Sequence, residues 1–227
     1  TLLDDQIVKA QTMLGSSYIK PILGVCKSWE SRLQYIQELL EEWLACQRTW
    51  MYLEPIFGSD DIMRQMPTEG RRFNTVDRTW RKIMQDTFDN PRVLTVGSKD
   101  SLLPKFRECN ELLEKIQKGL ADYLEVKRLV FPRFYFLSND ELLEILSQTK
   151  DPTAVQPFLG KCFEGCNRVR FEGEGDNIAI TAMIDEKGEV VVLDEPIFPQ
   201  QGRNKGNVEE WLLTLQARMR TSIKDII

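Results

Sequence analysis

The side chains that carry most enzyme chemistry are sparse in this sequence. Histidine is absent from all 227 residues, which excludes the Ser-His-Asp and Cys-His arrangements of nucleophilic catalysis within the chain. A zinc site would have to use cysteine and carboxylate ligands. Cys162 and Cys166 are closely spaced, but three residues separate them and no second pair lies nearby. We therefore interpret both as buried cysteines beside a helix rather than as metal ligands.

Two short loops resemble ligand-binding loops without meeting their requirements. Gly202-Arg-Asn-Lys-Gly206 lacks the spacing and the hydroxyl of the Gly-x-x-x-x-Gly-Lys-Ser/Thr phosphate loop, which occurs nowhere in the sequence. Glu172-Gly-Glu-Gly-Asp176 is acidic, but an EF-hand loop needs Gly at its sixth and Glu at its twelfth position. Counted from Glu172, those positions hold Asn177 and Met183. We predict a flexible loop and a solvated acidic turn.

Adjacent carboxylates occur at Glu41-Glu42 and at Asp140-Glu141. The first pair is typical of a solvated helix face, and the second places negative charge at a predicted helix N-terminus. Neither pair shows the contrasting environments that acid–base catalysis requires. An enzyme that acts on its own is therefore disfavoured.

Composition narrows the class of protein further. The net charge of −5 and the pI near 5.1 argue against a general affinity for nucleic acid or anionic membranes. No apolar run approaches the ~20 residues that cross a bilayer. The five cysteines are scattered and odd in number, which favours a reducing compartment. The opening, TLLDDQIVKA, is polar and begins without Met, so we expect no signal peptide and a fragment of a longer chain.

Long amphipathic helices dominate the pattern. Residues 29 to 50 repeat in steps of four and three, which predicts a helix that Pro55 ends before a turn at residues 58 to 61. The seam consists of Trp29, Leu33, Ile36, Leu40, Trp43, Gln47 and Trp50. A second helix is predicted from Phe73 to Phe88, and both of these residues are assigned to its apolar face. Asn90-Pro91 ends this helix. A third runs from Ser101 to Arg128, with an inward stripe of Leu103, Phe106, Asn110, Leu113, Ile116, Leu120 and Tyr123.

The stretch VFPRFYFLSNDELLEIL, from Val130 to Leu146, contains a cluster of aromatic residues followed by a helix start. Ser138 and Glu141 have the spacing of a capping box, and Leu137 and Leu142 that of a hydrophobic staple. Asp151-Pro152 predicts the start of another short helix. We interpret the stretch as a packed structural joint that fixes the angle at which a helix leaves an aromatic cluster. Its candidate residues are Phe131, Phe134, Tyr135, Phe136, Leu137, Ser138, Glu141 and Leu142.

Beyond residue 167 the hydrophobic period changes to two. Residues 178 to 184 and 189 to 193, joined by a turn at 185 to 188, predict a β-hairpin, to which Val169 and Phe171 add a possible third strand. A last helix follows, with an apolar face of Val208, Trp211, Leu212, Leu215, Met219 and Ile223. The predicted fold class is mainly α, an elongated stack of long helices with a small inserted β-hairpin. We divide it into a helical bundle (1–166), the hairpin (167–196) and a continuing helix (197–227).

Several long stretches resemble the linker region of dynein heavy chains, most closely the axonemal ones. They are LLEEWLACQRTWMYLEPIF (39–57), PTEGRRFNTVDRTWRKIM (67–84), RLVFPRFYFLSNDELLEILSQTKDP (128–152) and VQPFLGKCFEG (155–165). The resemblance implies a mostly helical, non-catalytic lever that bends and straightens over a ring of AAA+ ATPase modules. It implies ATP and Mg²⁺ bound only by those modules, with no cofactor in this stretch. It also implies other dynein subunits as partners, microtubule contact only through the full motor, and a location in the cytoplasm, cytoskeleton and ciliary or flagellar axoneme.

Patterning alone leaves a second function open. A helical scaffold or adaptor that binds a partner helix in a groove would show the same periodicity. For the lever, the breaks at Pro55, Pro91 and Pro132 are candidate hinges. The hairpin is then a candidate docking element for the ring.

Overall fold

The computed structural model describes residues 2–226, which form two compact units. The first unit comprises Thr1–Pro55 and Arg71–Gln117, and the second comprises Ile56–Gly70 and Lys118–Ile227. The prediction of a mainly α fold with a small antiparallel sheet is confirmed. No helix within residues 2–226 has the length and apolar character needed to cross a bilayer.

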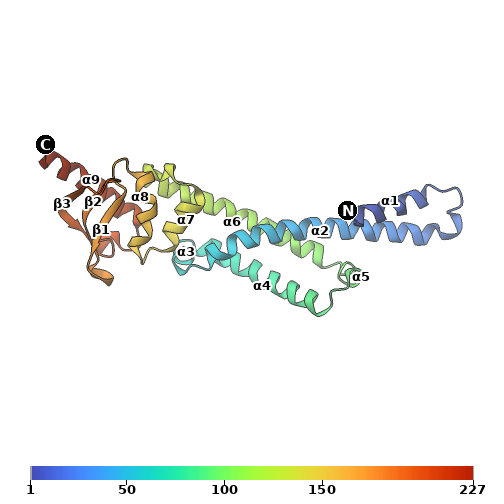
Figure 1. Ribbon diagram of the computed structural model, residues 1–227. Coiled ribbons are helices and arrows are strands. Elements are labelled where there is room, and N and C mark those ends of the chain that lie inside the picture. The colour runs from blue at the N-terminus through green and yellow to red at the C-terminus, as the bar shows by residue number, and fades with distance from the viewer. Residues whose placement is uncertain (1, 227) are drawn as a thin grey trace. The chain divides into compact units, whose positions relative to one another are not determined.

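Helices build the whole of the first unit. α1 (Leu2–Leu14) lies alongside α2 (Leu23–Phe57), and the short 3₁₀ turn η1 (Lys20–Ile22) precedes α2 (Figure 1). The unit also contains most of α4 (Pro67–Asp89), the single turn α5 (Val93–Val96) and the first half of α6 (Leu102–Val130).

Aromatic rings from three helices form the core of the first unit. Trp43 on α2 packs against Phe106 on α6 with ring centroids 4.9 Å apart. Trp80 on α4 meets Trp50 at 5.5 Å and the edge of Phe106 at 6.3 Å. Trp43 and Trp50 of the predicted seam therefore join α2 to α6 and α4 through ring contacts, which favour offset and edge geometries of this kind.

The seam on α2 differs from the prediction at Trp29, which is 40% exposed, and at Leu40, and the predicted end of the helix differs at Pro55. Leu39 is buried whereas Leu40 is 43% exposed, because the inward stripe of this long helix drifts around its axis. Pro55 lies inside α2, which continues to Phe57, so the predicted break there is wrong. Proline removes the bond to the carbonyl four residues earlier. That residue, Met51, lies on the exposed side of the helix.

The predicted face of α4 is correct in its middle and wrong at its end. Phe73, Val76, Trp80 and Ile83 are buried, but Phe88 is 82% exposed. At about 100° per residue, Phe88 lies roughly a quarter-turn away from the stripe that these residues define. The half-buried Thr87 takes the inward position instead.

α6 follows its predicted stripe closely and contributes to both units. Leu103, Phe106, Leu113, Ile116 and Leu120 are all buried. Gly119 has a packing role in the second unit. A Cβ at Gly119 would lie 2.9 Å from the side chain of Glu69 on α4, so glycine permits this close approach.

The second unit combines short helices with the sheet. Its helical elements are α3 (Asp60–Gln65), η2 (Pro132–Phe136), α7 (Asn139–Ser147), η3 (Pro152–Val155), α8 (Gln156–Cys162), η4 (Gly175–Asn177), η5 (Gly202–Asn204) and α9 (Val208–Ile226). The residues expected to form a turn, Asp60 and Asp61, are instead the first residues of α3. The predicted start at Asp151-Pro152 is confirmed, because the Asp151 side chain caps η3.

The sheet has three antiparallel strands in the order β1 (Arg168–Glu172), β2 (Ala179–Ile184) and β3 (Val190–Ile197). The hairpin and its third strand are thus confirmed. Gly188 closes the β2–β3 turn with φ of 88°, a conformation that glycine adopts without strain. α9 packs against β3 (Figure 1), and Asp194 on β3 accepts a 2.9 Å bond from Arg218. Of the predicted α9 face, Ile223 is the exception, because it is 44% exposed.

Candidate functional site: a polar and aromatic joint in the second unit

A buried carboxylate lies at the start of α3. Ser59 precedes the helix in an extended conformation, and its hydroxyl donates a 3.0 Å bond to the carbonyl of Ser147 at the end of α7. Asp61 follows in the first turn and is only 5% exposed. The helix start therefore places one acidic side chain inside the unit and holds α7 beside it.

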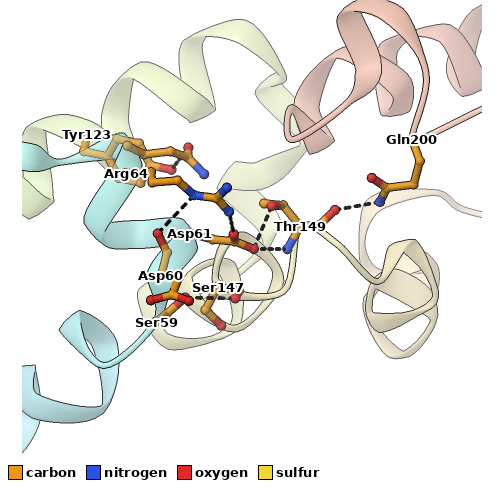
Figure 2. Close-up of polar contacts among 9 residues, drawn as sticks. Ser59, Asp60, Asp61, Arg64, Tyr123, Ser147, Thr149 and Gln200 are labelled. Atoms are coloured by element: carbon orange, nitrogen blue, oxygen red, sulfur yellow. Dashed lines mark hydrogen bonds and ion pairs between the residues drawn. The ribbon is translucent and has the colours of Figure 1, made fainter. Parts of the chain in front are cut away.

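Asp61 is satisfied by two kinds of donor (Figure 2). Its Oδ2 accepts from the Thr149 amide at 3.1 Å and from the Thr149 hydroxyl at 2.8 Å. Its Oδ1 pairs with Arg64, one turn along α3. Charge-assisted bonds of this type are stronger than neutral ones, and a buried carboxylate requires them.

The network continues from Thr149 to a distant loop. The Gln200 amide nitrogen donates a 2.7 Å bond to the Thr149 carbonyl, and Gln200 is itself buried. Nearby, the Tyr123 hydroxyl on α6 donates to the Gln65 side chain on α3 (Figure 2). Polar contacts therefore join α3 to α6, to the end of α7 and to the loop after β3.

The electrostatic balance at Asp61 favours the charged form. Burial raises the pKa of this carboxyl, but the hydrogen bonds from Thr149 and Arg64 and the Arg64 charge outweigh burial. The net pKa of Asp61 is lower than its ordinary value. Asp61 is therefore a structural anion at neutral pH, not a proton donor.

A second buried charge lies between α6 and α9. Lys127 and Glu209 are 8% and 6% exposed, and the Lys127 ammonium pairs with Oε1 of Glu209. The Tyr123 ring lies 5.5 Å from the same ammonium. Within residues 2–226, the second carboxylate oxygen of Glu209 is buried without a hydrogen-bond partner. This pair links α9 to α6 through opposite charges that are both buried.

The aromatic joint predicted at residues 131 to 142 divides into buried and exposed members. Phe131 and Phe134 are fully buried and meet edge to face, with centroids 4.9 Å apart. Phe163, just after α8, lies 5.9 Å from Phe131. Tyr135 and Phe136 are 54% and 68% exposed, so the interpretation of all these rings as packed is wrong for these two. Within η2, the ring of Phe134 points inward and the two rings that follow it are exposed.

The capping box is confirmed in full. The Glu141 amide donates to the Ser138 hydroxyl at 3.2 Å, and the Ser138 amide donates to Glu141 Oε2 at 2.9 Å. A cap of this kind contributes about 1 kcal/mol. Leu137 and Leu142 are both buried, as a hydrophobic staple requires. Lys161 on α8 also pairs with Glu141, so the helix start is linked to α8.

Sequence reasoning identified the capped, aromatic part of the joint and missed its polar part. Asp61 and Thr149 are 88 residues apart, and Lys127 and Glu209 are 82 residues apart. No local spacing connects them. The one available signal was a charged residue at a position where the helical period expects burial, which applies to Lys127, four residues after Tyr123 on the α6 stripe.

The cysteines are all free and buried in the described part of the chain. Burial raises the pKa of the Cys162 thiol to about 11, so it is a thiol and not a reactive thiolate at neutral pH. Residues 2–226 contain no cluster of three or more cysteine, aspartate or glutamate side chains placed to hold a metal ion. The site described above is thus a set of packing, capping and charge contacts.

Comparison with known proteins identifies the family. The family described as dynein heavy chain, N-terminal region 2, matches residues 1–227. The chain belongs to the dynein heavy chain family. Over 226 residues it is 54% identical to dynein axonemal heavy chain 1 of Rattus norvegicus and 55% identical to dynein axonemal heavy chain 12 of Homo sapiens. It is 51% identical to dynein axonemal heavy chain 3 of Homo sapiens.

These matches cover all of this dynein heavy chain sequence but little of each relative. The aligned part is 100% of the chain described above and 5% to 7% of the relatives. The joint at Asp61 and Ser138 therefore lies in the N-terminal region of a dynein heavy chain, and most of such a heavy chain lies outside it.

Proposed function

We propose that this chain is the linker of an axonemal dynein heavy chain, a lever that bends and straightens over the AAA+ ring and produces the power stroke in cilia or flagella. The observation that carries the proposal is the family match over the whole chain, with axonemal heavy chains at 50–55% identity. The interior packing and buried polar contacts of the two units support a mechanical role.

A lever must resist bending along most of its length. In the first unit, α2, α4 and α6 pack through Trp43, Trp50, Trp80 and Phe106. Close-packed interiors have low compressibility and transmit strain rather than absorb it. An added ion pair, Arg81 to Asp77 and Glu54, links α4 to α2 on the surface beside these rings. This part of the chain has the construction of a stiff element.

A lever must also keep its short elements in place under load. In the second unit, buried polar contacts link α3 with the end of α7, and α6 with α9. Such contacts are directional, and removing one partner leaves the other buried with an unsatisfied charge. They therefore favour a single arrangement of the helices that they join. Of the candidate hinges, Pro91 follows the end of α4 and Pro132 follows the end of α6, whereas Pro55 lies within α2.

The proposal assigns the chemistry to other parts of the heavy chain. This sequence has no phosphate-binding glycine loop, so ATP and Mg²⁺ would bind to the AAA+ modules, and microtubules would be reached only by the whole motor. The partners of the chain would be the AAA+ ring and other dynein subunits, and its location the axoneme.

The test uses the full-length motor and two matched substitutions. Asp61→Asn removes the buried charge, and Asp60→Asn makes the same change at the exposed neighbouring residue. We expect Asp61→Asn to reduce microtubule gliding velocity several-fold while microtubule-stimulated ATP hydrolysis continues, because the lever transmits less of each stroke. Asp60→Asn should leave both rates unchanged. Gliding that keeps pace with ATP hydrolysis in the Asp61 variant would contradict the proposal.

A further inference from the structure

One side of α2 carries an unusually regular stripe. Positions 33, 37, 40, 44, 47 and 51 are spaced by four and three residues and hold Leu, Gln, Leu, Leu, Gln and Met. Residues spaced in this way share one face of a helix and form the seam of a coiled coil. All six lie in the first unit. The six residues therefore lie along one face of α2.

α1 covers the first half of this stripe. Leu3, Ile7, Ala10 and Leu14 repeat with the matching spacing, and Ile7, Ala10 and Leu33 form one buried cluster. The Gln37 side chain donates to Asp4 at 3.5 Å. Asp4 contacts Gln37 of α2, whereas Ile7, which comes later in α1, packs with the earlier Leu33. The two helices therefore run antiparallel. Figure 1 shows α1 along the early part of α2, with the N-terminus over its middle.

The apolar residues in the second half of the stripe are exposed. Leu40 is 43% exposed, and Leu44 and Met51 are each 60% exposed, whereas Leu33 is 5% exposed. We call Leu40, Leu44 and Met51 the exposed stripe. Scattered apolar residues on a surface are normal, but three apolar residues in register with a covered row, interrupted only by the half-buried Gln47, favour an interface. α1 runs toward this row in its N-terminal direction.

We propose that, in the heavy chain, the segment directly preceding Thr1 continues along α2 and covers the exposed stripe. The relatives are many times longer than this chain, which spans 5% to 7% of them, and α1 runs along α2 toward the exposed stripe, so the geometry favours the upstream segment as its cover. A helical continuation of α1 would reach Met51 with about twelve residues at 1.5 Å per residue, and an extended one with fewer. This interface is independent of the proposed lever function.

Hydroxyl-radical footprinting of the full-length heavy chain tests the interface. Met51 should be oxidised several-fold more slowly than Met13, although Met51 is the more exposed of the two in the isolated fold, at 60% against 47%. Replacing about twelve residues before Thr1 with a Gly-Ser stretch of equal length should remove this protection. Met84, 37% exposed on α4, reports whether the first unit stays folded.

Three outcomes would overturn the proposal. Rapid oxidation of Met51 in the unaltered chain would mean that nothing covers the stripe. Protection that survives the Gly-Ser replacement would mean that another heavy-chain segment or another subunit covers it. If the replacement also exposes Met84, the first unit has unfolded and the oxidation of Met51 is not informative. A photo-cross-linking benzoylphenylalanine in place of Leu44 then identifies the covering segment without altering the upstream residues. The expected cross-link is to the peptide that directly precedes Thr1, and a cross-link elsewhere or none would refute the assignment.

Discussion

Asp61 at the start of α3 holds both the backbone amide and the hydroxyl of Thr149, at 3.1 and 2.8 Å, across 88 residues of sequence. One carboxylate oxygen thus fixes the segment that follows α7. The carbonyl of the same threonine accepts from Gln200, so Thr149 links α3 to the loop after β3. Removing the Asp61 side chain would therefore affect α3, the segment after α7 and the loop after β3 together.

Asp61→Ala should lower the free energy of unfolding by about 3 kcal/mol. The substitution leaves the buried Thr149 amide and hydroxyl without their acceptor, and an unsatisfied buried donor costs about 1–3 kcal/mol each. Chemical denaturation of the chain followed by circular dichroism measures the change. Asp60→Ala is the control, because Asp60 is exposed and its loss should cost less than about 1 kcal/mol. Equal losses at the two positions would show that the Thr149 contacts contribute little.

The contribution of Asp61 should depend on pH in one direction. Its folded pKa is lower than the ordinary value, so the unfolded chain binds the proton more readily. The stabilisation is fully present above the unfolded pKa of ~3.9 and is lost as the pH falls through the lower folded pKa. The difference in unfolding free energy between the unaltered chain and Asp61→Asn should therefore shrink below about pH 4. A difference that stays constant or grows under acid would contradict this assignment.

The aromatic residues of η2 allow a comparison within one short element. Phe134→Ala should destabilise the chain by about 3–5 kcal/mol, because the ring is fully buried against Phe131. Phe136→Ala should cost less than about 1 kcal/mol, because that ring is 68% exposed. Thermal or denaturant unfolding of the two variants measures both. If Phe136→Ala leaves stability unchanged but slows gliding by the intact motor, the exposed ring is a contact surface.

Local signals in the sequence predicted the secondary structure well. The capping box at Ser138 and Glu141, the cap at Asp151 and the β2–β3 turn each depend on residues within a few positions of one another. The errors in the predicted buried faces of the helices have a common cause. Leu40, Phe88 and Ile223 were assigned to buried faces by spacing alone, but spacing does not indicate where a neighbouring element ends or how far a stripe drifts around a long helix.

The polar contacts of the joint could not be predicted from local spacing in the sequence. Asp61 was assigned to a turn at residues 58 to 61, and aspartate at a helix start is exposed in most proteins. Its burial depends on Thr149, which only the tertiary fold brings near. Lys127 and Glu209 present the same difficulty, because a buried pair is recognisable only when both partners are placed. The long-range polar contacts of a fold are thus less predictable than its caps and turns.

The buried pair between α6 and α9 provides a further prediction. Lys127→Met should destabilise the chain by about 3–5 kcal/mol, because it leaves the Glu209 carboxylate buried without its cation. The double variant Lys127→Met with Glu209→Leu should recover much of that loss, since an apolar pair of similar volume removes the desolvation cost of both charges.

The control is the neighbouring carboxylate on α9. Glu210 is exposed, so Glu210→Leu should change the stability by less than about 1 kcal/mol and should not rescue Lys127→Met. A double-mutant cycle measured by denaturant unfolding isolates the coupling between Lys127 and Glu209 from their separate effects. Coupling near zero would mean that the ion pair contributes nothing and that apolar residues such as Trp211 and Leu215 hold α9. Recovery in the double variant would show that the stability lost in Lys127→Met comes from burial of the unpaired charge and not from lost packing.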